Sequence, residues 1–146
     1  MSKLILSAFM FAVVFAACGG GSTSSPGASV TPSGPAAPAS LAGTSWTAIS
    51  VGGQPVVADH PPTARFGPAE VDGTTGCNSY GGGYTYADGT IAFGPLRMTL
   101  MACIGPIGEV EGRFTAAMTG ATTAVVDAQG HLTIDGTAGS VVFVAS

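Results

Sequence analysis

A long stretch near the N-terminus, residues 19–40, consists almost entirely of Gly, Ser, Thr, Ala and Pro and contains no charged or aromatic residue. Such a segment buries too little apolar surface to offset the conformational entropy that folding removes. Its prolines stiffen it partway toward polyproline II. We therefore predict a tether here and place the folded domain in residues 41–146, where apolar alternation and turn signals begin.

The segment before the tether has the pattern of an export signal. Lys3 provides a short positive start, and residues 4–15 form a continuous apolar run. That run is too short to span a membrane, which takes about 20 residues, but it suits a signal peptide. Residues 15–18, Phe-Ala-Ala-Cys, resemble the lipobox of bacterial lipoproteins. We therefore expect residues 1–17 to be a signal peptide and Cys18 to carry the lipid; cleavage as an ordinary secretory signal is the alternative.

The same pattern predicts where the mature protein resides. A lipid on Cys18 would hold it on a membrane, and residues 18–40 would connect this anchor to the domain. Gly19 is not the aspartate that retains lipoproteins in the inner membrane. We therefore expect an exported protein that is lipid-anchored in the bacterial envelope, on the periplasmic side of the outer membrane if the host is Gram-negative.

Charge narrows the classes of partner. Removing the signal peptide removes Lys3, the only lysine, so three arginines stand against eight acidic residues and the net charge is −5. Nucleic-acid binding requires clustered Lys and Arg, and electrostatic adhesion to an anionic bilayer requires a basic patch, so we expect neither. The missing lysine also excludes Schiff-base chemistry and lysine-dependent phosphate loops.

The domain shows short alternating segments separated by glycine-rich turns, which is the pattern of antiparallel strands. Its clearest hairpin signal is the Asp-Gly pair at 88–89. In the first segment, Thr47, Ile49 and Val51 are expected on one face and Trp46 on the other. The predicted strands are residues 45–51, 63–66, 69–74, 83–87, 90–93, 123–128, 131–135 and 140–144.

One late segment has helical periodicity instead. Apolar residues recur every three or four positions at Ile107, Val110, Phe114 and Met118, and Gly120 is placed to end the helix. The predicted fold class is therefore mainly β with one helix. We expect a small antiparallel, partly open β-barrel that the helix closes at one side.

Cys77 and Cys103 remain as a pair once Cys18 is assigned to the lipid. In an oxidising compartment such a pair favours a disulfide, which would destabilise the unfolded chain by roughly 3.5 kcal/mol. A reactive thiol is the functional alternative, but it needs an activating base or cation that the local sequence lacks. Neither cysteine has a partner at metal-ligand spacing, so we expect no metal and no other cofactor.

Four short motifs occur along the domain. Residues 76–84 follow the pattern Gly-Cys-Asn-x-x-x-Gly-x-Tyr, and residues 99–103 follow Thr-x-Met-x-Cys. Residues 111–114 match Glu-x-x-Phe of the following helix, and residues 41–46 match the Leu-x-Gly-Thr-x-Trp opening. Together these motifs resemble the META domain family, the HslJ-like envelope proteins. They occur in the family's order, span nearly all of the domain, and follow a lipoprotein signal and tether as in many members.

The resemblance implies a compact β-rich fold with one helix. It also implies loosely defined links to heat shock, novobiocin resistance and envelope integrity, but no known reaction. Ser79 and Leu100 stand where many members carry basic residues. Any family role that depends on that positive pair is therefore not expected here.

The Gly-Cys-Asn corner has a structural and a functional interpretation. As a structural turn, Gly76 permits positive φ and Asn78 bonds to nearby backbone. As a binding surface, the corner offers Asn78, Tyr80, Tyr84 and Tyr86, because tyrosines supply amphipathic anchors. The structural interpretation is favoured, and these four residues are the candidate binding residues if the corner also recognises a partner.

The remaining polar residues form no catalytic or metal-binding constellation. His60 and His131 are expected to be exposed, without a partner at metal spacing. Glu111 is expected to make a weak surface contact with Arg113 or Arg97. We therefore predict no catalytic residue and no enzyme.

The leading functional hypothesis is a lipid-anchored protein that binds an envelope protein partner or stabilises the envelope under stress. One alternative is a small lipoprotein that inhibits a hydrolase, which requires a rigid, protruding loop. The other is a binder of an apolar small ligand inside the barrel. A cavity lined by Trp46, Phe93 and Phe114 would favour the ligand hypothesis.

Overall fold

The computed structural model describes residues 34–146. The predicted signal peptide, Cys18 and most of the tether lie outside these residues. The described part contains ten strands and one helix. They are β1 (Ser45–Val51), β2 (Gln54–Pro55), β3 (Thr63–Phe66), β4 (Glu70–Thr74), β5 (Ser79–Ala87), β6 (Thr90–Phe93), β7 (Arg97–Met98), α1 (Pro106–Thr119), β8 (Ala121–Val126), β9 (Leu132–Gly136) and β10 (Gly139–Ala145).

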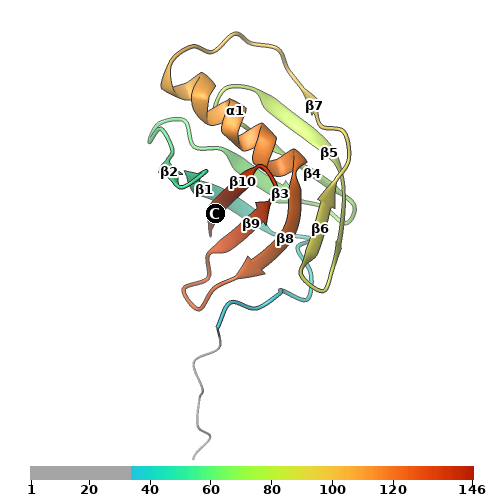
Figure 1. Ribbon diagram of the computed structural model, residues 1–146. Helices are drawn as coiled ribbons and strands as arrows, with labels where there is room; N and C mark the ends of the chain where they lie inside the picture. Colours follow the sequence, from blue (N-terminus) through green and yellow to red (C-terminus); the bar gives the residue numbers. More distant parts are fainter. Residues whose placement is uncertain (1–33) are drawn as a thin grey trace, which may run out of the picture. The chain divides into compact units, whose positions relative to one another are not determined.

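Eight of the strands close an antiparallel barrel (Figure 1). The order around it is β1-β3-β4-β5-β6-β8-β9-β10, and β10 returns to pair with β1. The short strands β2 and β7 add to β1 and β5 outside this circuit. The barrel is therefore fully closed rather than partly open, because the first and last strands of the domain pair from Trp46 with Ala145 to Val51 with Val141.

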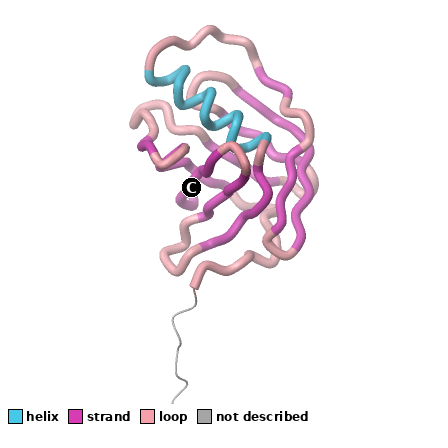
Figure 2. Tube along the Cα trace, viewed as in Figure 1, coloured by secondary structure: helices cyan, strands magenta, loops and turns pink. Residues whose placement is uncertain are grey.

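The helix and the hairpins form where the sequence predicts them. Pro106 occupies the first turn of α1, and Gly120 caps its end. At the tip of the β5–β6 hairpin, Asp88 and Gly89 both adopt positive φ, as a type I′ turn requires. Figure 2 shows α1 lying across one end of the barrel. The helix packs against β1, β9 and β10, and its buried residues are Val110, Phe114, Ala117 and Met118.

The pattern of buried and exposed side chains in β1 departs from the simple alternation predicted from the sequence. Trp46, Ala48 and Val51 are buried, whereas Ile49 is exposed. The pairing with β10 shifts register between Ala48 and Ser50, so one extra residue is inserted at this point. Such a bulge reverses the alternation beyond it, which places Val51 on the same face as Trp46. The prediction that Val51 faces away from Trp46 is therefore wrong.

The barrel interior is filled with side chains. Phe66, Phe114 and Phe143 are fully buried in the hydrophobic core. The ring of Phe114 packs edge-to-face against Tyr80, with ring centroids 5.4 Å apart, and against Phe143, with centroids 6.4 Å apart. Phe66 and Tyr84 also pack edge-to-face, with centroids 5.1 Å apart. These edge-to-face ring contacts join β5, β10 and α1 within the hydrophobic core.

The end of the predicted tether is bound to the barrel. Ala36 exchanges two backbone hydrogen bonds of 2.8 Å with Val126 of β8. The hydroxyl of Tyr86 donates a 2.6 Å hydrogen bond to the carbonyl of Pro38. These residues meet the barrel at the end opposite α1 (Figure 1). The folded part therefore begins a few residues before position 41.

Candidate functional site

The Gly-Cys-Asn corner is a tight turn between β4 and β5. The amide of Thr75 donates a 2.8 Å hydrogen bond to the carbonyl of Asn78, which closes the turn. Gly76 has φ of 92°, and a Cβ at this position would collide with the carbonyl oxygen of His60. Only glycine meets both conditions, so the first residue of the motif is required by backbone geometry.

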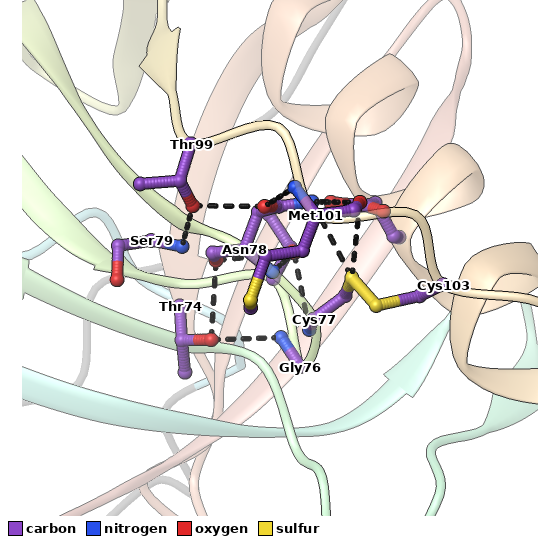
Figure 3. Close-up of a disulfide and its surroundings, with 10 residues drawn as sticks. Thr74, Gly76, Cys77, Asn78, Ser79, Thr99, Met101 and Cys103 are labelled. Carbon is purple, nitrogen blue, oxygen red and sulfur yellow. Dashed lines mark hydrogen bonds between the residues drawn. A yellow bond between two sulfur atoms is a disulfide. The ribbon is translucent and has the colours of Figure 1, made fainter.

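The side chain of Asn78 joins this turn to the segment that follows β7 (Figure 3). Its Oδ1 accepts hydrogen bonds from the Thr99 hydroxyl at 2.8 Å and from the Met101 amide at 2.7 Å. Its Nδ2 donates to the Met101 carbonyl at 3.1 Å. Asn78 is only 3% exposed. One buried amide therefore holds both backbone polar groups of Met101.

Glu111 of α1 completes the buried network. Its Oε1 accepts hydrogen bonds from the Thr75 hydroxyl at 2.9 Å and from Asn78 Nδ2 at 2.8 Å. It forms no ion pair with Arg97 or Arg113, whose ion pairs are with Glu70 and Glu109, so the expected surface ion pair of Glu111 is wrong.

The sequence did contain a signal for this role of Glu111. Glu111 follows Val110 and precedes Phe114 by three residues, which places it at the border of the buried helix face. A carboxylate at that border is expected to find hydrogen-bond donors inside the fold. Thr75, which our sequence interpretation did not name, and Thr99, the first residue of the Thr-x-Met-x-Cys motif, belong to the same network.

A disulfide fastens the other end of the segment, as predicted. Cys77 and Cys103 are bonded across 26 positions of sequence, with their Cα atoms 6.2 Å apart. The first turn of α1 lies directly under this point, since a Cβ at Gly108 would collide with the carbonyl oxygen of Cys103. Asn78, the disulfide and α1 therefore fix the segment in three places.

Between these fixed points the chain presents apolar side chains to solvent. In the segment 100–104, which we call the apolar loop, Leu100 is 96% exposed, Ile104 90% and Met101 59%. No charged residue occurs from Met98 to Gly108. The apolar loop lies at the end of the barrel that carries α1 (Figure 1). Exposed large hydrophobic side chains held on a fixed backbone are typical of a binding surface.

The three tyrosines are arranged differently from a surface cluster. Tyr80 is buried, and its hydroxyl donates a 2.9 Å hydrogen bond to the carbonyl of Thr63. Tyr84 and Tyr86 are half-buried and donate to the carbonyls of Gly67 and Pro38. Each hydroxyl thus bonds to backbone of another segment. Of the four candidate binding residues, Asn78 and Tyr80 are buried, and their hydrogen bonds position the segments around them.

Comparison with known proteins identifies the family. The META domain family matches residues 39–146, which includes the corner, the apolar loop and α1. The chain belongs to the META domain family. No curated protein sequence matches the chain significantly.

Two solved structures have the same fold as this META domain. One is a protein from Burkholderia xenovorans, solved by NMR, which is 28% identical over 84% of this chain and 97% of its own, with a TM-score of 0.65. The other, also an NMR structure, is 25% identical over 70% of this chain and 89% of its own, with a TM-score of 0.59.

Among residues 34–146, the ion-paired side chains form isolated pairs, of which His131 with Asp127 is one. His131 Nδ1 lies 3.2 Å from Asp127 Oδ2, and Asp127 Oδ1 accepts hydrogen bonds from the amides of Gln129 and His131. These bonds lower the pKa of Asp127 and mark it as the residue that holds the β8–β9 turn. Within residues 34–146, no three His, Cys, Asp or Glu side chains are grouped to hold a metal ion, and no helix is long and apolar enough to cross a membrane.

The buried phenol of Tyr80 makes the stability of the META domain sensitive to alkaline pH. Burial raises the pKa of Tyr80 far above its ordinary value of about 10, and the charge of Asp72 adds to this effect. The neutral phenol is therefore favoured in the fold. Stability is fully present below pH 10 and is lost as the pH rises above it.

Tyr80→Phe isolates this contribution, because the pKa values of Tyr84 and Tyr86 are also raised by burial. At neutral pH we expect the variant to lose about 1 kcal/mol, the value of one hydrogen bond. Urea unfolding between pH 8 and 11 should show the gap between wild type and variant narrowing. If the free energies of unfolding of wild type and variant changed in parallel with pH, the alkaline sensitivity would not arise from Tyr80.

Proposed function

We propose that this protein is an exported, lipid-anchored META domain protein of the bacterial envelope that acts by binding a protein partner, without catalysing a reaction. The observation that carries the proposal is the apolar loop. Leu100 and Ile104 are almost completely exposed, while Asn78 and the Cys77–Cys103 disulfide hold the backbone between them.

A fixed loop is well suited to this task. Binding normally costs the entropy of ordering the groups that make contact, and a loop that is already ordered avoids much of that cost. Three apolar side chains are too few for a flat interface, since a stable one takes about 800 Å² per partner. They are suited to serve as anchors that enter an apolar recess of a partner, with the neighbouring surface as a rim.

The position at which the tether joins the barrel is consistent with the apolar loop being the binding surface. Residues 36–38 bind at one end of the barrel and the apolar loop lies at the other. The chain that leads toward Cys18 therefore leaves the barrel at the end away from the apolar loop. The acidic mature chain, with a net charge of −5, favours a protein partner over an anionic lipid surface.

In-cell crosslinking tests the partner. We expect the wild-type protein to capture one dominant envelope protein and Leu100→Ser with Ile104→Ser to lose it, with mass spectrometry as the readout. Ile49→Ser is the matched control, because Ile49 is an exposed apolar residue of β1 outside the loop. Capture that is unchanged in the loop variant, or equally lost in the control, would contradict the proposal.

Lipidation is tested on Cys18. The mature N-terminal peptide of the wild-type protein should carry the mass of a lipid, and Cys18→Ala should move the protein from the membrane fraction to the soluble fraction. A wild-type N-terminus that begins at residue 18 without added mass would contradict lipid anchoring and indicate ordinary secretion.

A second candidate function is hydrolase inhibition, because the apolar loop protrudes and is closed by a disulfide. Such a loop would occupy the active-site cleft of an attacking enzyme. The candidates differ in the identity of the captured protein and in its activity. If the captured protein is a hydrolase, adding the META domain protein should lower its rate; a captured protein that is not a hydrolase would contradict inhibition.

The proposed role in envelope stress requires a separate test. The stress links of the HslJ-like proteins would come to this chain only through the family. A strain lacking the protein is expected to grow more slowly after heat shock and to recover when the wild-type chain is restored. Equal growth of the two strains after heat shock would contradict a stress role while leaving partner binding in place.

A further inference from the structure

An open recess of about 380 Å³ lies beside the apolar loop. Its walls include Met98, Leu100 and Met101, and Asn78 and Glu111 also line it. The recess is therefore mostly apolar, with a single ionisable group. That group, the Glu111 carboxylate, belongs to the buried network described above and is held in place by it.

The two oxygens of Glu111 have different surroundings. Oε1 accepts the hydrogen bonds from Thr75 and Asn78. Oε2 accepts none from the described residues, and it is not among their buried atoms that lack a partner. Oε2 is therefore not fully enclosed, and its lone pairs can accept a hydrogen bond from a donor that enters the recess.

The described residues supply no cation to this carboxylate. All three arginines pair elsewhere: Arg65 with Asp72 at 2.8 Å, Arg97 with Glu70 at 3.9 Å and Arg113 with Glu109 at 3.8 Å. The two histidines offer no substitute, since His131 pairs with Asp127 and no ion pair joins His60 to Glu111. A half-buried carboxylate in an apolar recess is stabilised when a cation reaches it.

We infer that this recess receives a lysine or arginine side chain of the protein partner. The aliphatic stem of that side chain would lie along Met98, Leu100 and Met101, and its cationic end would donate a hydrogen bond to Glu111 Oε2. This inference rests on the proposed function, because it describes the partner of the same surface. Leu100 would thus face the partner on one side and the inserted side chain on the other.

The charge of the whole domain agrees with a basic partner. The mature chain has three arginines against eight acidic residues, so its long-range field attracts a basic surface and raises the rate of encounter. The apolar loop then supplies contact area that does not depend on salt, while Glu111 supplies the directional contact. The expected partner presents an apolar recess with a lysine or arginine at its border.

Model peptides test the recess on the intact chain. The full-length, ¹⁵N-labelled protein in detergent is titrated with Ac-Ala-X-Ala-NH₂, in which X is lysine, arginine or norleucine. Norleucine has the apolar stem of lysine without its charge. We expect lysine or arginine to bind about tenfold more tightly than norleucine, equal to about 1.4 kcal/mol. The readout is the chemical shift of the Met101 amide and of the Asn78 side-chain amide.

Glu111→Gln removes the charge but keeps an acceptor for Thr75 and Asn78. It should abolish the preference for the cationic peptides, whereas Glu109→Gln, on an exposed residue of the same helix, should preserve it. Equal binding of all three peptides to the wild-type protein would overturn the inference without relying on any variant. A preference for the cationic peptides that persists in the Glu111→Gln variant would also overturn the inference.

Partner capture separates this inference from the proposed function. Suppose that Glu111→Gln captures the partner as well as wild type does, while the loop variant Leu100→Ser with Ile104→Ser loses it. The inference about the recess would then be wrong, and the proposed binding function would stand. If the loop variant captures the partner normally, the proposed function itself is wrong. Loss of capture in both variants, with the peptide preference in wild type, supports both.

Discussion

Asn78→Ala is expected to lower the free energy of unfolding by about 4 kcal/mol and to release the apolar loop. The amide of Asn78 is buried and bonds to both backbone polar groups of Met101 and to Glu111 Oε1. Truncation removes the Asn78 partner of both Met101 backbone groups and leaves Glu111 Oε1 with the Thr75 hydroxyl alone. Each buried polar group that loses its partner costs about 1–3 kcal/mol. The loss is therefore larger than that of a single surface hydrogen bond.

Urea unfolding of the oxidised protein measures this loss, and hydrogen exchange at the Met101 amide measures the release of the loop. Ser79→Ala is the matched control, since Ser79 is the exposed neighbour and its hydroxyl makes no hydrogen bond to the described residues. We expect it to remain within about 0.5 kcal/mol of wild type. If the two variants were equally stable, the Asn78 network would not hold the corner.

Phe114→Ala is expected to lower the free energy of unfolding by about 3–5 kcal/mol. Phe114 is fully buried, and its ring connects α1 to Tyr80 of β5 and to Phe143 of β10. The truncation removes the contact between the helix and the two sides of the barrel and leaves a cavity that the closed barrel cannot fill by collapse. Urea unfolding again provides the measurement.

A control of opposite sign lies on the same helix. Gly112 faces open space, with no atom within 4 Å of a Cβ built on it. Because glycine inside a helix is less favourable than alanine, Gly112→Ala should raise the free energy of unfolding by about 0.5–1 kcal/mol. A loss below about 1 kcal/mol for Phe114→Ala would mean that α1 does not pack into the barrel as described.

Local features of the domain were predictable because short-range chemistry decides them. The Asp88-Gly89 pair tolerates the positive φ of a type I′ turn, and the turn forms there. The spacing from Ile107 to Met118 matches the period of a helix, and Pro106 and Gly120 bound it. The disulfide was predictable from the number of cysteines: Cys18 was assigned to the lipid, which left Cys77 and Cys103 to pair with each other.

The candidate site was only partly predictable. The motif around Gly76 and Asn78 indicated the right corner, and the Thr-x-Met-x-Cys segment indicated its partner. The tyrosines were placed on the surface because alternation alone does not reveal where a hydroxyl finds its acceptor. Tyr80 reaches Thr63 and Tyr86 reaches Pro38, contacts over 17 and 48 positions that no local pattern contains.

The sequence by itself determined the helix, most strands, the main turns, the cysteine pair and the family, since each depends on neighbouring residues or on a short motif. Only the tertiary structure decided the closure of the barrel, the bulge that turns Val51 inward, and the environment of Glu111. These features arise from pairs distant in sequence: Trp46 with Ala145, and Thr75 with Glu111. Their energies depend on desolvation in the assembled core, which no local segment experiences alone.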